Sequence, residues 1–108
     1  MVVRFGVYEG RLREGGAERF YGLAFDELLP ALRAFPGCVE ASVLRPVEVE
    51  AGAPGWVLAL SMRYPDRAAC DAALQSQERL VARAIVARML EMFEGSVHHY
   101  VFDEKRRL

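Results

Sequence analysis

The sequence predicts one α+β domain over residues 1–108, with a ferredoxin-like β-α-β-β-α-β order. Four segments alternate apolar and polar residues with the period of a strand. Two longer segments, one after the first strand and one after the third, repeat apolar residues at helical spacing. This order predicts a four-stranded antiparallel sheet with both helices on one face.

The first strand is expected from Val2 to Tyr8. Val3, Phe5 and Val7 alternate with more polar residues, so we expect these three side chains to lie under the helices. The next stretch, Glu9 to Glu18, carries three glycines and is rich in charge. This composition favours an exposed loop.

The first helix is expected from Phe20 to Phe35, and Pro36 and Gly37 end it. Pro30 interrupts the pattern, because proline has no N–H and crowds the preceding turn. Either the helix begins near Asp26, a suitable N-cap, or it kinks at Pro30.

The second and third strands are expected within Cys38 to Glu50 and from Trp56 to Tyr64. A glycine- and proline-rich turn, Ala51 to Gly55, separates them. In the third strand one face carries the larger apolar side chains, which are Trp56, Leu58, Leu60, Met62 and Tyr64.

The second helical segment is expected to begin after Asp66, whose carboxylate can cap the free N–H groups of the first turn. Ser76 marks a break or a second cap. From Gln77 to Phe93 an apolar stripe covers about four turns, consisting of Val81, Ala84, Ile85, Met89 and Met92. Gly95 is expected as the C-cap.

The last strand holds both histidines of the chain, His98 and His99. Neighbouring side chains of a strand point to opposite faces, so only one of them can face a given cavity. Residues 103–108 form a charged tail.

The sheet face opposite the helices is expected to mix apolar, aromatic and polar side chains. Its expected members are Arg4, Tyr8, Glu40, Ser42, Leu44, Val57, Ala59, Ser61, Arg63, His98, Tyr100 and Phe102. Such a mixture suits the wall of a partly enclosed cavity. It also suits a sheet-to-sheet dimer, in which a two-fold axis lets one face cover its copy.

Composition narrows the classes of partner. The net charge is −1, which gives no electrostatic reason to expect nucleic acid. No apolar run is long enough to span a membrane, and the first residues do not have the features of a signal peptide. We therefore expect a cytoplasmic protein whose two cysteines, Cys38 and Cys70, are free thiols.

Several short motifs resemble EthD-like proteins of the dimeric α/β-barrel superfamily, to which antibiotic-biosynthesis monooxygenase-like domains also belong. The first motif is the run from Pro30 to Gly37, which is similar to the Pro-Leu-x-x-x-Leu-Pro-Gly run of the EthD first helix. Leu60 to Asp66, Ala72 to Glu78 and the ending from Phe93 to Val101 are also similar. The EthD pattern often has a histidine where this chain has Leu28, so that residue's role cannot be transferred.

The resemblance implies a homodimer whose two sheets close into a barrel, with a small-molecule pocket between sheet and helices. Relatives of this kind include isomerases, cyclases and cofactor-free monooxygenases acting on ring compounds. The expected function is therefore cofactor-independent chemistry on a small organic molecule. A non-enzymatic binding or accessory domain of the same fold is the alternative.

His98 is the predicted catalytic acid or base, because imidazole titrates near neutral pH. His99, sorted to the helix face, is expected to be structural. Arg4 and Arg63 could bind a carboxylate or enolate, although Arg63 could instead pair with Glu40. The other predicted substrate-binding residues are Tyr8, Ser61 and Tyr100, and either tyrosine could instead be a packed aromatic.

No cofactor and no metal are expected. Adjacent histidines of a strand point apart, and no His, Cys or carboxylate side chains lie at a recognisable ligand spacing. Neither a haem-ligand motif nor a phosphate-binding glycine loop is present.

Overall fold

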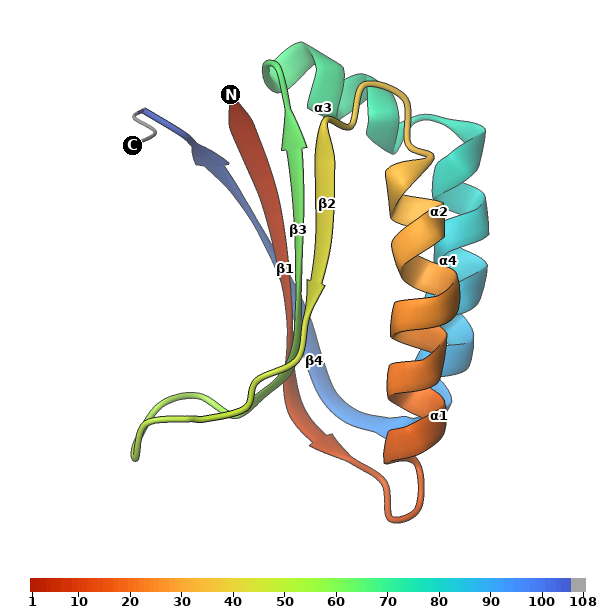
Figure 1. The fold of residues 1–108 in the computed structure, drawn as a ribbon, viewed down its shortest axis with the longest axis vertical. Helices are drawn as coiled ribbons and strands as arrows, with labels where there is room; N and C mark the ends of the chain where they lie inside the picture. The colour runs from red at the N-terminus through yellow and green to blue at the C-terminus, as the bar shows by residue number, and fades with distance from the viewer. Residues whose placement is uncertain (106–108) are drawn as a thin grey trace.

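A computed structural model describes residues 1–105 and confirms the ferredoxin-like α+β architecture. The antiparallel sheet has the order β2-β3-β1-β4 and comprises β1 (Val2–Leu12), β2 (Glu40–Leu44), β3 (Trp56–Tyr64) and β4 (Phe93–Asp103). The helical segments all lie on one side of this sheet (Figure 1). The central strands are β3 and β1, and β4 is an edge strand beside β1.

The first helical segment is continuous from Ala17 to Arg33, which is longer at its start than predicted. It consists of α1 (Ala17–Gly22), a π-helical turn η1 (Leu23–Leu28) and α2 (Leu29–Arg33). Of the two alternatives offered by the sequence, the helix start near Asp26 is therefore wrong. The wide π turn ends two residues before Pro30, whose ring and missing N–H would otherwise disturb a regular α-helix.

The second helical segment is broken at Ser76, as predicted. It consists of α3 (Arg67–Leu74), α4 (Gln77–Met89) and a short 3₁₀ turn, η2 (Leu90–Met92). Asp66 caps α3, accepting a hydrogen bond from the Ala69 N–H at 2.8 Å. The buried stripe of α4 is offset from the predicted one, because Ala82 and Ile85 are buried while Val81 is exposed.

Gly95 lies inside β4 and not at the end of a helix, so the predicted C-cap is wrong. It pairs with Gly10 of β1, and both have positive φ, +151° for Gly10 and +153° for Gly95. A Cβ atom on either glycine would lie 2.1 Å from a carbonyl oxygen of the opposite strand. The two strands can cross this closely only because both residues lack side chains.

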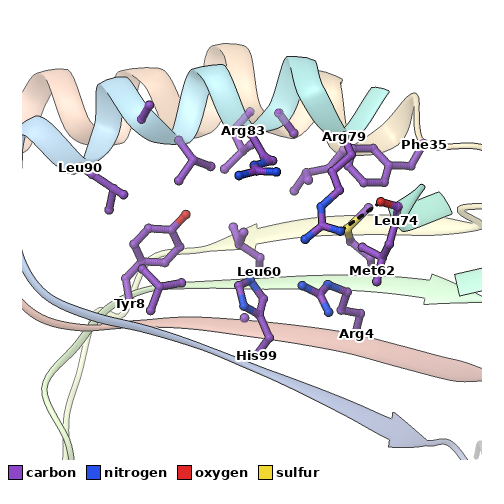
Figure 2. A pocket seen from close by; sticks show the side chains of 17 residues that line it. Arg4, Tyr8, Phe35, Leu60, Met62, Leu74, Arg79, Arg83, Leu90 and His99 are labelled. Carbon is purple, nitrogen blue, oxygen red and sulfur yellow. Dashed lines mark hydrogen bonds between the residues drawn. The ribbon is translucent and has the colours of Figure 1, made fainter. Parts of the chain in front are cut away.

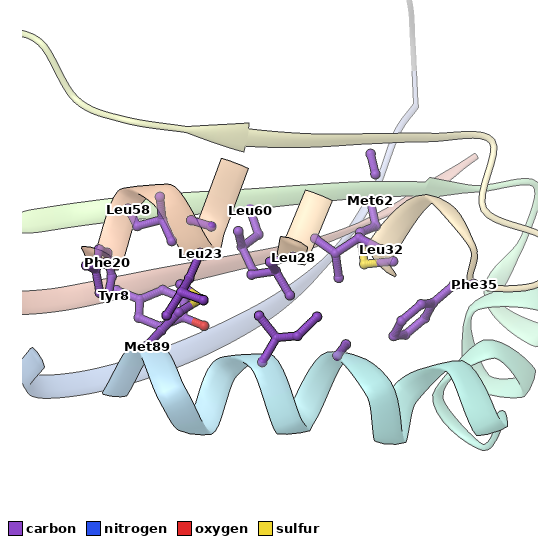
Figure 3. Close-up of a cluster of buried hydrophobic side chains, with 14 of the residues drawn as sticks. Tyr8, Phe20, Leu23, Leu28, Leu32, Phe35, Leu58, Leu60, Met62 and Met89 are labelled. Carbon is purple, nitrogen blue, oxygen red and sulfur yellow. The ribbon is translucent and has the colours of Figure 1, made fainter. Parts of the chain in front are cut away.

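The core lies between sheet and helices and is built mainly from aliphatic and aromatic side chains (Figure 3). Phe20, Leu28, Leu58 and Met89 are all 0% exposed. Tyr8 packs edge-on against Phe20 at a ring-centroid distance of 6.0 Å. The residues on the helix-facing side of the sheet are Val2, Arg4, Gly6, Tyr8, Ala41, Val43, Leu58, Leu60, Met62, Tyr64, Val97, His99 and Val101.

The sequence predicted correctly which residues of β2 and β4, and of β3 after Trp56, lie on the helix-facing side. For β1 the prediction of which residues face the helices is wrong. In the β1–β3 register Arg4 pairs with Met62 and Gly6 with Leu60, which places the even-numbered residues of β1 under the helices. Val3, Phe5 and Val7 therefore lie on the open face. Trp56 also belongs to the open face, because a bulge beside Tyr8 and Glu9 shifts the register and the Trp56 ring contacts Phe5.

None of the helices in residues 1–105 is long and apolar enough to cross a membrane. Both cysteines in this part of the chain are free thiols, and Cys70 is fully buried. Of the expected charged tail, Asp103 ends β4, and residues 106–108 lie outside the described part.

Candidate functional site

A cavity of about 510 Å³ lies between the sheet and the helices. Its walls are mostly apolar and include Leu28, Leu32, Leu60, Met62 and Val86. The volume and lining are those of a site for a small organic molecule. The cavity occupies the position that the resemblance to EthD-like proteins implied.

Five polar side chains face this apolar space, from three different elements. Arg4 and Tyr8 come from β1, His99 from β4, and Arg79 and Arg83 from α4. Arg4, Arg79 and His99 point toward the same part of the cavity, whereas Tyr8 lies farther along it (Figure 2). Within residues 1–105, no aspartate or glutamate belongs to the lining.

His99 owes its position to Gly6, which pairs with it across β1 and β4. A Cβ atom at Gly6 would approach the His99 Cδ2 atom to 3.1 Å, closer than most real Cβ contacts. The glycine thus leaves room for the imidazole to lie over β1. His99 lines the cavity from an edge strand and is itself an exposed residue.

The environment of His99 lowers the pKa of its imidazole below the ordinary value. Burial is the main cause, followed by the positive charges of Arg4 and Arg79 and by His98. The neutral imidazole is therefore favoured near neutral pH. A neutral imidazole can accept a proton, as a general base must.

The Arg4 guanidinium also lies in an unusual environment. Burial and the nearby Arg79 charge lower its pKa from the ordinary value, although an arginine remains protonated. Burial raises the pKa of the Tyr8 phenol to about 12, so the hydroxyl keeps its proton and can donate it in a hydrogen bond. Within residues 1–105, no hydrogen bond involves the Tyr8 hydroxyl.

Arg79 is held by the chain itself. Its Nη1 donates a hydrogen bond of 3.0 Å to the Leu74 carbonyl, at the end of α3. This contact ties the guanidinium to the junction of α3 and α4, directly over the cavity (Figure 2). The remaining N–H groups of this guanidinium are left for other partners.

The structure separates the six predicted site residues into two groups. Arg4 and Tyr8 line the cavity, contrary to the open-face position expected for both. Ser61, Arg63, His98 and Tyr100 lie on the open face, as sorted from the sequence. The roles predicted for these residues stay predictions, but the six side chains do not share one site.

Arg63 has carboxylate partners on the open face. Its Nη2 donates to Glu104 at 2.8 Å, and its Nη1 lies 3.6 Å from Glu40. These contacts raise the pKa of its guanidinium, chiefly through the Glu104 hydrogen bond. The ion pair with Glu40 that the sequence offered as the alternative is therefore present.

Two cavity arginines were missed by the sequence analysis. Arg79 and Arg83 belong to an amphipathic helix, where arginines are expected on the solvent face. For His99 one signal was available in Gly6, since a glycine inside a strand often marks a close approach by another group. Among residues 1–105, no three His, Cys, Asp or Glu side chains form a group that could hold a metal ion.

Comparison with solved structures confirms the predicted resemblance at the level of the fold. An EthD family protein from Bacillus halodurans superimposes with a TM-score of 0.74 at 22% identity, covering 96% of this chain and 98% of that one. An antibiotic biosynthesis monooxygenase gives a TM-score of 0.65 at 17% identity, over 95% and 97% of the two chains.

A third similar structure is SnoaB, a cofactor-independent oxygenase from Streptomyces nogalater. Its TM-score is 0.64 at 18% identity, over 99% of this chain and 95% of that one. No protein-family model and no curated protein matches the sequence. The chain thus has the fold of the EthD and antibiotic biosynthesis monooxygenase proteins.

Proposed function

We propose that the protein is an enzyme that binds a small organic carbonyl compound in the cavity and moves a proton on it. The observation that carries this proposal is the neutral-favoured imidazole of His99 beside two guanidinium groups in an otherwise apolar space. Cofactor-independent chemistry is already known on this fold, as the similar oxygenase from Streptomyces nogalater shows for itself.

In the proposed reaction His99 removes a proton from the carbon next to a carbonyl group. The electron pair of the broken C–H bond moves onto the carbonyl oxygen and forms an enolate. Arg4 and Arg79 stabilise this negative charge, which is stronger in the transition state than in the bound substrate. Return of the proton from the imidazolium to another atom of the conjugated system completes an isomerisation.

Tyr8 provides a second contact in this proposal. Its hydroxyl lies in the cavity at some distance from the His99 group and keeps its proton because of its raised pKa. It can donate a hydrogen bond to a further oxygen of a ring compound. The substrate would then be held at both ends, with its apolar body against Leu60 and Val86.

The test uses β-tetralone, a bicyclic ketone with acidic protons next to its carbonyl, in D₂O. We expect the protein to catalyse exchange of these protons for deuterium, followed by NMR. The His99→Gln variant should lose this activity, by about a hundredfold or more for a general base. The matched variant His98→Gln, on the open face, should retain it.

The opposite pattern would support the role predicted for His98 from the sequence. Equal exchange by wild type and His99→Gln would overturn the assignment of His99 as the base. No exchange above background by the wild type, together with tight binding of the ketone, would favour a non-enzymatic binding domain. That second candidate is favoured by one observation: within residues 1–105, no hydrogen bond orients the His99 ring.

We also propose that two copies of the chain associate through their open sheet faces. Phe102 is 51% exposed there and Tyr100 47%, and Phe102 contacts Phe5 at a ring-centroid distance of 6.1 Å. An exposed aromatic cluster of this kind marks a protein contact surface. A second copy can cover it through a two-fold axis, and analytical ultracentrifugation tests this dimer.

A further inference from the structure

The cavity holds positive charge without a matching negative charge. Arg4, Arg79 and Arg83 all line it, and none of them forms a salt bridge with any carboxylate in residues 1–105. Away from the cavity, Arg11, Arg13, Arg63, Arg67 and Arg88 each pair with a carboxylate. Arg19, Arg33 and Arg45 form no salt bridge in residues 1–105 but are exposed to solvent, so the half-buried arginines without a carboxylate among these residues are Arg4 and Arg79.

Two like charges in a partly buried space are unfavourable. Arg4 is only partly exposed and the Arg79 charge acts on it, so each guanidinium raises the cost of the other. Buried charges are normally paired or hydrogen-bonded, because their desolvation is costly. A bound anion between the two guanidinium groups would remove this cost.

The positions of the two arginines suit one small planar anion. Arg4 rises from β1 and Arg79 descends from α4, so their guanidinium groups approach the same space from opposite walls (Figure 2). Arg79 is fixed by its hydrogen bond to the Leu74 carbonyl, which reduces the entropy lost on binding. A carboxylate can accept hydrogen bonds from both guanidinium groups at once.

The rest of the lining defines what the anion is attached to. Beyond the arginines the walls are apolar and include Ala82 and Val86. Leu60 and Leu90 lie on the way toward Tyr8 (Figure 2). A hydrophobic ring or chain would be buried along this path, while a second charge would lie against aliphatic side chains. The cavity therefore suits a molecule with one anionic end and an apolar body.

We propose that the substrate of this enzyme is a hydrophobic carboxylic acid, whose carboxylate is bound between Arg4 and Arg79. This inference rests on the proposed function and assigns it a substrate class. It gives Arg79 the role of a specificity-determining residue, which selects the anion before any chemistry occurs. The carbonyl group that reacts lies next to this carboxylate and near His99, so the same two guanidinium groups also face the enolate oxygen. The apolar body extends toward Tyr8.

The experiment compares binding of β-naphthoate with binding of its neutral amide, β-naphthamide, by fluorescence titration and calorimetry. The two probes have the same ring and almost the same shape, so their affinity ratio reports the charge. We expect wild type to prefer the carboxylate by about tenfold or more, as a charge-assisted hydrogen bond would give. The preference should weaken as salt is added.

Arg79→Gln should reduce this preference at least severalfold while leaving amide binding nearly unchanged. Arg19→Gln is the matched control, because Arg19 is exposed on α1 and forms no salt bridge within the described residues. His99→Gln should keep the carboxylate preference, which separates anion binding from proton transfer.

Equal affinity of wild type for the two probes would overturn the carboxylate assignment and leave the proposed proton transfer intact. A carboxylate preference that is the same in wild type and Arg79→Gln would also overturn the carboxylate assignment. Failure of both probes to bind would overturn the carboxylate assignment and the small-molecule site together. Carboxylate-selective binding without deuterium exchange of β-tetralone would support the anion site and count against the enzyme.

Discussion

Both faces of the sheet carry arginine and aromatic side chains, but within residues 1–105 the arginine on the open face is paired with carboxylates and the one on the helix face is not. On the open face Arg63 is held between Glu40 and Glu104, and the aromatic rings around Phe102 are exposed. On the helix face Arg4 is partly buried without a carboxylate partner in residues 1–105, and the aromatic rings are packed in the core. A paired arginine fixes structure, whereas an unpaired one beside a cavity is available to a ligand.

The largest expected effect is on the free energy of unfolding. It should be large for a variant on the packed, helix-facing side and small for one on the open face. Leu28→Ala removes a side chain that is 0% exposed and should lower the free energy of unfolding by about 2–5 kcal/mol. Leu44→Ala, at a residue that is 49% exposed on the open face, should cost less than about 1 kcal/mol. Urea titrations of the two variants check this difference, and similar losses would contradict it.

The second prediction compares one arginine from each face. Arg4→Met should slow deuterium exchange of β-tetralone by about a hundredfold, because an enolate would lose one of its two guanidinium partners. Arg63→Met, which breaks the contacts to Glu40 and Glu104, should leave the exchange rate within about twofold of wild type. Equal slowing by both variants would show that the open face takes part in the reaction.

The third prediction concerns association through the open face. Phe102→Asp places a charge in the aromatic cluster and should weaken the proposed dimer by about tenfold or more, because the charge would be buried against its copy. Leu80→Asp changes an apolar residue of α4 that is similarly exposed, at 58%, and serves as the control. Sedimentation across a concentration series measures both, and a wild type that stays monomeric at high concentration would rule the dimer out.

The smallest expected effect is a dependence on pH. Because the folded-state pKa of His99 lies below its ordinary value, the unfolded chain binds this proton more readily than the folded protein. His99 should therefore reduce stability as the pH falls below about 6.5, and contribute nothing above that value. NMR titration, with the His99→Gln variant used to assign the signal, should show the imidazole titrating below its ordinary value.

Much of the fold follows from local patterns in the sequence. The Asp66 cap, the break at Ser76 and the order of the elements all depend on residues within one turn or strand, where propensity and spacing are informative. The faces of β3 beyond Trp56, and of β4, were also predicted, because their apolar residues alternate with polar ones. Each of these features is determined by neighbours close in the chain.

Which residues of β1 face the helices could not be predicted in the same way, because both faces of this strand are partly apolar. Val3, Phe5 and Val7 look like residues of the core under the helices, yet they lie on the opposite side of the sheet, where Phe5 contacts Phe102 and Val7 is only 1% exposed. Arg4 looks like a solvent residue, yet it faces the cavity. Assigning strand faces from apolar alternation assumes that one face is solvated and polar. That assumption fails in β1, because one face lines a cavity and the other carries apolar and aromatic side chains.

The π turn at Leu23–Leu28 has a consequence for sequence length. A π turn contains one residue more than the α turn it replaces, while the helix continues in the same direction on either side. Removing the exposed Asp26 should therefore regularise this turn and leave Phe20 and Leu32 in their present places. A single-residue deletion normally rotates the rest of a helix by about 100°, which turns its buried side chains away from the core. Here, related chains could differ by one residue in the middle of a helix and still share the same core.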